Sequence, residues 1–166
     1  MNEFIHYREI EYAGFNSWPA KEQQELFGII LRYSDGYTKR ANSANVLEHV
    51  HCDFLELVEQ VETYFNGKNI PCVFRLTSFS DNKAFDHYLA DNNYALLDHS
   101  LILTRSVSDI HVDPSCFVQK SCDDWMISFC SVSEESIAQH RGHLDILKRI
   151  KEKLVSRKAK PEVAAK

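Results

Sequence analysis

The stretch from Phe27 to Val46 constrains the fold of this chain more than any other part of the sequence. Two β-prone runs flank Asp35-Gly36, a dipeptide that readily supplies the positive φ angles of a two-residue hairpin turn. The sequence therefore predicts an antiparallel hairpin that closes at this dipeptide. The residues that would face each other across it are Arg32 and Lys39, Leu31 and Arg40, and Ile29 and Asn42.

This register creates two conflicts. Arg32 and Lys39 would be opposed like charges, which destabilise a strand pair unless a carboxylate or an anion lies between them. We therefore expect at least one acidic side chain within salt-bridge reach of this pair, with Glu22 or Glu25 of the preceding segment as the first candidates. Arg40 and Asn42 would project onto an otherwise apolar face, where polar groups must be paired or functional. Two interpretations stay open, since local groups could satisfy both residues or both could line a ligand site.

Upstream of the hairpin the sequence predicts two helices. The first runs from Phe4 to Phe15 and stops near Gly14. Pro19 suits the first turn of the second helix, which good helix formers continue to Leu26. Trp18 lies at the corner between them, either as a packing residue that fixes the helix angle or as a wall of a substrate cleft.

Downstream, an amphipathic helix is expected from about Leu47 to Asn66, because apolar residues recur at helical spacing, and Gly67 is placed to end it in a left-handed cap. Those apolar residues are Val50, Phe54, Leu57, Val61 and Phe65. A strand covered on both faces should follow at Ile70–Thr77. A short helix from Ser80 or Asp81 to Asn92-Asn93 and a long strand from Tyr94 to Ser106 complete this region.

The carboxyl-terminal third gives weaker signals. Residues 107–118 have the composition of a linker, with Asp113-Pro114-Ser115 at its centre. Periodicity alone leaves Asp123–Val132 as either a strand or the first turns of a helix. Glu134–Lys153 is predicted to be helical. The last ten residues are charged and small, as is typical of a chain end.

Two segments carry a resemblance to a known family. Leu31–Ser43, together with Asn16–Ala20, resembles the amino-terminal region of a subgroup of GNAT-family N-acetyltransferases. The resemblance covers roughly the first two thirds of the chain and, more weakly, Trp125–Ile150. It implies an α+β, GNAT-like fold of the acyl-CoA N-acyltransferase type, with a mixed sheet flanked by helices and a helical extension at the carboxyl end. One departure is Gly28-Ile29, where the family more usually has Gly-Trp.

The resemblance also implies a chemistry, acetyl transfer from acetyl-CoA to a small-molecule or peptide amine. In the family the strand before the long helix splays from its neighbour, acetyl-CoA lies in the gap, and its pyrophosphate rests on the helix amino terminus. Substrate-wall residues on this basis are Trp18, Arg40, Asn42 and Ser43. For the base that removes the amine proton, Glu11, Glu22 and Glu25 are available, and the sequence does not choose among them.

The glycine-rich phosphate loop of the family is missing before the first long helix. Residues 47–53 contain no glycine, and Glu48 and Asp53 would repel a phosphate. Gln139–Leu144 follows the loop pattern until Leu144 replaces its last small residue, inside a stretch predicted to be helical. We therefore expect a degenerate GNAT-like domain at 1–106, a linker at 107–122 and the truncated helical start of a second GNAT domain at 123–166. On this reading binding of acetyl-CoA by the chain itself is in doubt.

Composition narrows the class of protein. A net charge of -5 argues against a general nucleic-acid-binding surface. No apolar run approaches the about 20 residues of a membrane span, and no signal peptide begins the chain, so a cytoplasmic protein is expected. The five cysteines have no CxxC spacing, which fits reduced thiols, and neither His111, Cys116 and Cys122 nor the pair His140 and His143 has a metal-binding pattern. The alternative function is a catalytically inactive GNAT-like module for interaction or homodimerisation.

Overall fold

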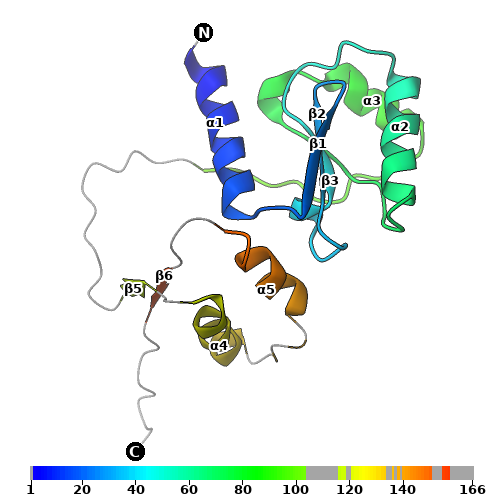
Figure 1. Ribbon diagram of the computed structural model, residues 1–166. Coiled ribbons are helices and arrows are strands. Elements are labelled where there is room, and N and C mark those ends of the chain that lie inside the picture. The colour runs from blue at the N-terminus through cyan, green and yellow to red at the C-terminus, as the bar shows by residue number, and fades with distance from the viewer. Residues whose placement is uncertain are drawn as a thin grey trace, which may run out of the picture. The chain divides into compact units, whose positions relative to one another are not determined.

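The computed structural model describes residues 2–103, 116–118, 121–133, 136, 138, 140–150 and 155–157, and it is drawn as a ribbon in Figure 1. The chain divides into two compact units, residues 1–100 and 101–166, which are described separately below. No helix of the described part is both long enough and apolar enough to cross a membrane.

The first unit is built on a four-stranded mixed sheet in the order β1-β2-β3-β4. The strands are β1 (Glu22–Leu26), β2 (Ile29–Tyr33), β3 (Ser43–Val46) and β4 (Phe74–Leu76). The first three pair antiparallel, while β3 and β4 are parallel. This mixed sheet, with helices on its faces, is the predicted α+β architecture.

Helices cover both faces of the sheet, with α1 (Asn2–Ser17) on one side and α2 (Phe54–Asn66) on the other, followed in the chain by α3 (Lys83–Asp91) (Figure 1). Strand alternation explains the two layers, because side chains of neighbouring strand residues point to opposite faces. Ile29 and Leu31 pack in the main core against α2 and α3, whereas Ile30 packs with Phe15 of α1. The fully buried side chains of the main core include Leu57, Val61, Phe65 and Phe85.

The prediction of a helix from Pro19 to Leu26 is wrong, because Glu22–Leu26 forms the edge strand β1. Phe27 and Gly28 both have positive φ, 50° and 79°, and join β1 to β2 in a two-residue hairpin in which Leu26 faces Ile29. Pairing with β2 gives one side of this segment's backbone its hydrogen-bond partners, so tertiary structure overrides local helix propensity. The polar side chains of Glu22–Glu25 are exposed, as suits an edge strand.

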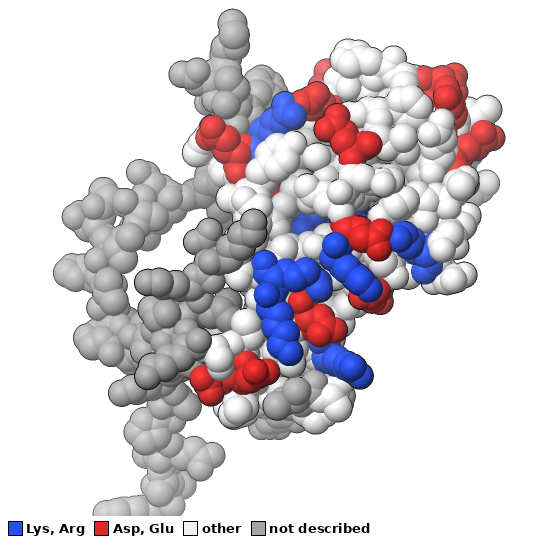
Figure 2. All heavy atoms as spheres, viewed as in Figure 1, with Lys and Arg blue, Asp and Glu red and all other residues white. Residues whose placement is uncertain are grey.

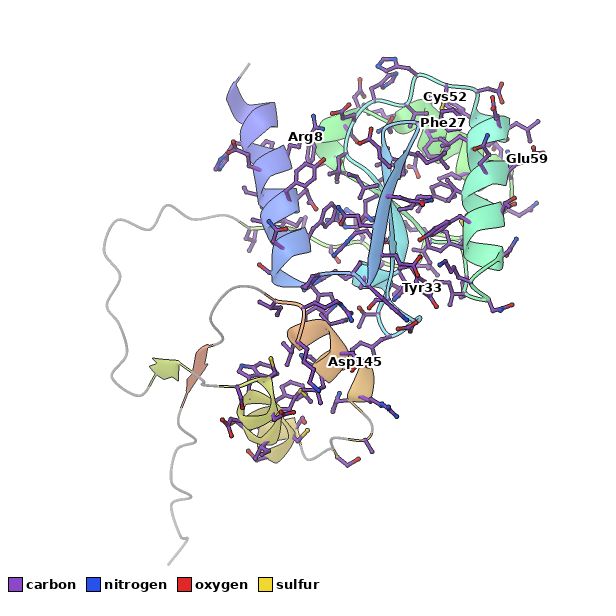
Figure 3. All side chains as sticks on the ribbon, in the orientation of Figure 1. Arg8, Phe27, Tyr33, Cys52, Glu59 and Asp145 are labelled. Atoms are coloured by element: carbon purple, nitrogen blue, oxygen red, sulfur yellow. The ribbon has the colours of Figure 1, made fainter. Side chains whose placement is uncertain are left out.

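Phe27 occupies a turn position that asparagine and glycine prefer, at the tip of the hairpin (Figure 3). We expect Phe27→Asn to raise the free energy of unfolding by about 0.5–1 kcal/mol, since asparagine tolerates the left-handed conformation at lower cost. The phenylalanine side chain is 45% exposed, so its removal sacrifices little burial. Thermal unfolding checks this, with Phe27→Ala as the control that removes the ring without gaining that tolerance. A lower melting temperature for Phe27→Asn than for Phe27→Ala would contradict the expectation.

The Asp35-Gly36 turn forms, but the hairpin register drawn around it is wrong. Asp35 and Gly36 have φ angles of 52° and 74°, and Tyr37 N–H donates to Ser34 O at 3.3 Å. The chain then makes a 3-10 turn at Lys39–Ala41 before β3 begins. The observed pairs are Arg32 with Ser43, Leu31 with Ala44, Ile30 with Asn45 and Ile29 with Val46. The conflict of opposed cations therefore does not arise.

The buried amide of Asn42 explains the wider loop. Its Oδ1 accepts from the N–H groups of Ser34 (2.7 Å) and Gly36 (3.0 Å), and its Nδ2 donates to Thr38 O (2.8 Å). One side chain thus satisfies the backbone groups that strand pairing would otherwise have to satisfy. This closes residues 34–42 as a compact loop.

The predictions for the rest of the first unit are confirmed in part. The helix predicted from Leu47 begins at Phe54, where the Asp53 carboxylate caps it, and Gly67 has a φ of -62°, so the left-handed cap is wrong. The helix predicted from Ser80 or Asp81 is α3, and the strand predicted at Ile70–Thr77 is present over Phe74–Leu76. The long strand predicted from Tyr94 is absent over residues 94–103, and residues 104–106 lie outside the described part.

The second unit contains α4 (Cys122–Ser133), α5 (Arg141–Leu147) and a pair of antiparallel strands, β5 (Cys116–Val118) and β6 (Val155–Arg157). The ambiguous segment 123–132 is thus helical, while helix is described over only seven residues of the predicted Glu134–Lys153. Of the predicted linker, residues 107–115 lie outside the described part. The rings of Trp125 and Phe129 stack with centroids 5.3 Å apart and contact His143. Burial, and then His140, lowers the pKa of His143.

Candidate functional site

A cleft lies where the two parallel strands of the first unit end. Because β3 and β4 run in the same direction, the residues that follow them emerge at the same edge of the sheet. The carboxyl ends of parallel strands are where α/β sheets commonly bind ligands. The cleft has a volume of about 330 Å³, and its lining includes Arg8 of α1, Leu47, Glu48 and His49 after β3, and Phe79 and Asp81 after β4.

Hydrogen bonds join the two loops that form the cleft. The Asn82 side chain accepts from Val50 N–H (2.9 Å) and donates to Glu48 O (2.8 Å). His49 Nδ1 lies 2.9 Å from Asp81 O. Since a carbonyl oxygen only accepts, Nδ1 is the donor in this contact. The cleft is therefore preformed.

The cleft carries charges of both signs. Arg8 extends from α1 on the side that faces the sheet (Figure 3) and forms an ion pair with Glu48, both side chains being about half-exposed, at 47% and 48%. Asp81 is a second acidic residue of the lining. A hydrogen bond with Tyr12 raises the pKa of Arg8 against the effect of burial, and Glu48 adds to the rise. Acidic and basic side chains also lie next to one another over the face seen in Figure 2.

The residues around the start of α2 do not fit the pyrophosphate of acetyl-CoA. Val50 N–H donates to Asn82 and Glu56 N–H donates to the Asp53 carboxylate, so two of the groups that would hold an anion already have partners. The strands β3 and β4 are also hydrogen-bonded from Ala44 and Phe74 to Val46 and Leu76, with no splay over these residues. A pyrophosphate would therefore meet no free backbone N–H at Val50 or Glu56.

The four predicted substrate-wall residues lie around the loop that precedes β3, at the opposite end of that strand from the cleft. Trp18 Nε1 donates to Thr38 Oγ1 at 3.0 Å. Asn42 organises the loop, and the hydroxyl of Ser43, which is 1% exposed, accepts from Asn45. The Arg40 side chain is exposed. The structure brings these residues together, but none of them lines the cleft.

An acidic side chain does lie within salt-bridge reach of the pair, but it is Asp98 and neither Glu22 nor Glu25. Lys39 pairs with Asp98, and Glu22 pairs with Lys68. Arg32 is fully buried and donates to three backbone carbonyls, those of Phe15, Trp18 and Arg40. Its charge is thus stabilised by peptide dipoles, which sequence patterns do not reveal.

The candidate bases occupy unsuitable positions for proton transfer. Both carboxylate oxygens of Glu11 accept from Arg75, at 2.7 and 2.9 Å. Glu22 is held by Lys68, and Glu25 is exposed on the edge strand. Among the described residues there is also no group of three or more metal-ligating side chains.

Sequence reasoning missed most of the cleft. It noted Glu48 only as a group that repels phosphate and Asp81 only as a possible helix start, and it did not single out Arg8, His49 or Phe79. One signal was present, namely that β-prone segments on either side of a helix predict parallel strands whose following loops meet. The position of Arg8 depends on how α1 packs against the sheet, which no local pattern encodes.

The fold and the comparisons define the class of protein. The mixed sheet flanked by helices is GNAT-like, and the family model described as "Probable histone acetyltransferase Rv0428c C-terminal" matches residues 5–148. The chain belongs to this family of GNAT-type acetyltransferases. It is similar to a Bacillus subtilis (strain 168) protein described as "Uncharacterized N-acetyltransferase YobR", with 29% identity over 150 residues. The matched region is 86% of this chain and 60% of that protein, and no solved structure matches the chain.

Proposed function

We propose that this chain is a non-catalytic part of a GNAT-type N-acetyltransferase, a protein that transfers acetyl from acetyl-CoA to a small-molecule or peptide amine. One observation carries the proposal. Backbone N–H groups near the start of α2, where the family binds the cofactor, already donate hydrogen bonds to side chains of the domain itself. The Asn82 side chain accepts a hydrogen bond from Val50 N–H, and the Asp53 carboxylate accepts one from Glu56 N–H. A working family member would present free N–H groups to the pyrophosphate here. Glu48 and Asp53 add negative charge at the same place.

Isothermal titration of the full chain with acetyl-CoA tests the proposal. We expect no saturable heat up to about 1 mM ligand, which corresponds to a binding free energy weaker than about -4 kcal/mol. The full-length Bacillus subtilis relative serves as the comparison sample, because this chain matches only 60% of its length. A dissociation constant in the micromolar range for the 166-residue chain would overturn the proposal.

A further inference from the structure

We propose that the cleft at the ends of β3 and β4 binds a zwitterionic α-amino acid with an apolar side chain. Arg8 would bind its carboxylate, Glu48 and Asp81 its ammonium group, and Leu47 and Phe79 its side chain. The proposal deepens the proposed function and rests on it, because this cleft is open to another ligand only if the chain does not bind acetyl-CoA there.

The charges of the cleft match a zwitterion better than a singly charged ligand. A plain amine would leave Arg8 unused, and a plain carboxylate would meet two like charges in Glu48 and Asp81. A phosphate would meet the same repulsion more strongly. A ligand with a cation and an anion a few ångströms apart offers an opposite charge both to Arg8 and to the acidic residues of the lining.

The ion pair between Arg8 and Glu48 shows that the two groups reach each other across the cleft. Both side chains are about half-exposed, and an exposed pair of this kind is worth little net stability because water screens it. A zwitterion can replace the pair at small cost. The planar guanidinium of Arg8 can then form two parallel hydrogen bonds with the ligand carboxylate, a stronger arrangement.

The apolar part of the lining supplies the third element of recognition. Leu47 is 3% exposed, and the ring of Phe79 stacks on that of Tyr7 with centroids 6.0 Å apart. His49, whose Nδ1 lies 2.9 Å from Asp81 O, is also part of the lining. The cleft has a volume of about 330 Å³, at the small end of the range for ligand pockets, and this size suits an amino acid.

Isothermal titration of the full chain with L-phenylalanine and L-leucine tests the assignment, with phenethylamine and hydrocinnamate as analogues that each lack one charge. We expect saturable binding of at least one amino acid below about 10 mM, and binding of each analogue weaker by about tenfold or more. No binding of either amino acid up to that concentration would overturn the assignment and leave the proposed function standing. Equal binding of phenethylamine would also overturn it, since the cleft would then recognise amines alone.

Two variants locate the site. Arg8→Gln and Glu48→Gln remove one charge each from exposed positions and are each expected to weaken amino-acid binding by about tenfold or more. Arg40→Gln and Glu59→Gln are the matched controls, since both residues are exposed and lie outside the cleft lining. Amino-acid binding that survives both cleft variants would overturn the assignment. Binding of acetyl-CoA in competition with the amino acid would instead overturn the proposed function.

Discussion

Replacement of Arg32 by methionine is expected to lower the free energy of unfolding by about 3 kcal/mol. The guanidinium is fully buried and donates to Arg40 O at 2.8 Å, Phe15 O at 3.2 Å and Trp18 O at 2.5 Å. Methionine fills a similar volume but leaves these carbonyls without that donor, at a cost that exceeds the gain from removing a buried charge. Urea unfolding measures the effect as a shift of the midpoint at constant m-value.

Arg40→Met is the matched control for this experiment. The loop uses the backbone carbonyl of Arg40, whereas its side chain is exposed, so the control should change stability by less than about 0.5 kcal/mol. Arg32→Lys should fall between the two, because a single ammonium cannot reproduce the fork that serves carbonyls from three directions. Equal midpoints for Arg32→Met and Arg40→Met would contradict the expectation.

Arg32 joins three parts of the first unit. Phe15 and Trp18 lie at the end of α1, where helix carbonyls lack partners inside the helix and the helix dipole favours a cation. Its guanidinium carbon also lies 4.3 Å from the centroid of the Phe15 ring. Burial, and then the charges of Arg75 and Arg40, lowers the pKa of Arg32 to about 10, so the side chain stays protonated at neutral pH. The residue thus fixes α1, β2 and the loop before β3 to one another.

The hairpin around Arg32 illustrates which parts of the fold could be predicted from the sequence. The Asp35-Gly36 turn was correctly identified because its chemistry is local. The register was not, because it depends on Asn42 closing the loop and on α1 supplying carbonyls to Arg32. The apolar periodicity before Gly67 correctly predicted a helix. The helix-forming residues of Glu22–Leu26 did not form one, since pairing with β2 decides the conformation of that segment.

The candidate site divides in a similar way. The prediction that residues 47–53 lack a phosphate loop rests on glycine content and charge, which are read directly from the sequence. The sequence could not show that the Asn82 side chain, about thirty residues later, accepts a hydrogen bond from the N–H of Val50. The cleft itself combines α1 with two loops, and its residues are distant in sequence. Trp18, Arg40, Asn42 and Ser43 carried the family resemblance, and the contacts of Trp18 and Asn42 with Thr38 show that these two organise the loop before β3.

The second large effect is expected at Glu11. Its side chain is 8% exposed and accepts two hydrogen bonds from Arg75 of β4, so the pair ties α1 to the edge of the sheet. We expect Glu11→Leu to lower the free energy of unfolding by about 2–4 kcal/mol, because a partly buried guanidinium loses its partner. Glu9→Leu, an exposed position on the same helix, is the control and should change stability by less than about 0.5 kcal/mol.

A double-mutant cycle separates the value of the ion pair from the cost of breaking it. Adding Arg75→Met to Glu11→Leu removes the orphaned charge, so the double variant should recover at least about 1 kcal/mol relative to Glu11→Leu alone. Additive losses would show instead that the two residues act independently. The result bears on the cleft, because Arg8 lies three residues before Glu11 and therefore on the same face of α1. If Glu11 and Arg75 hold that face against the sheet, Glu11→Leu should weaken amino-acid binding even though Glu11 is not among the residues of the cleft lining.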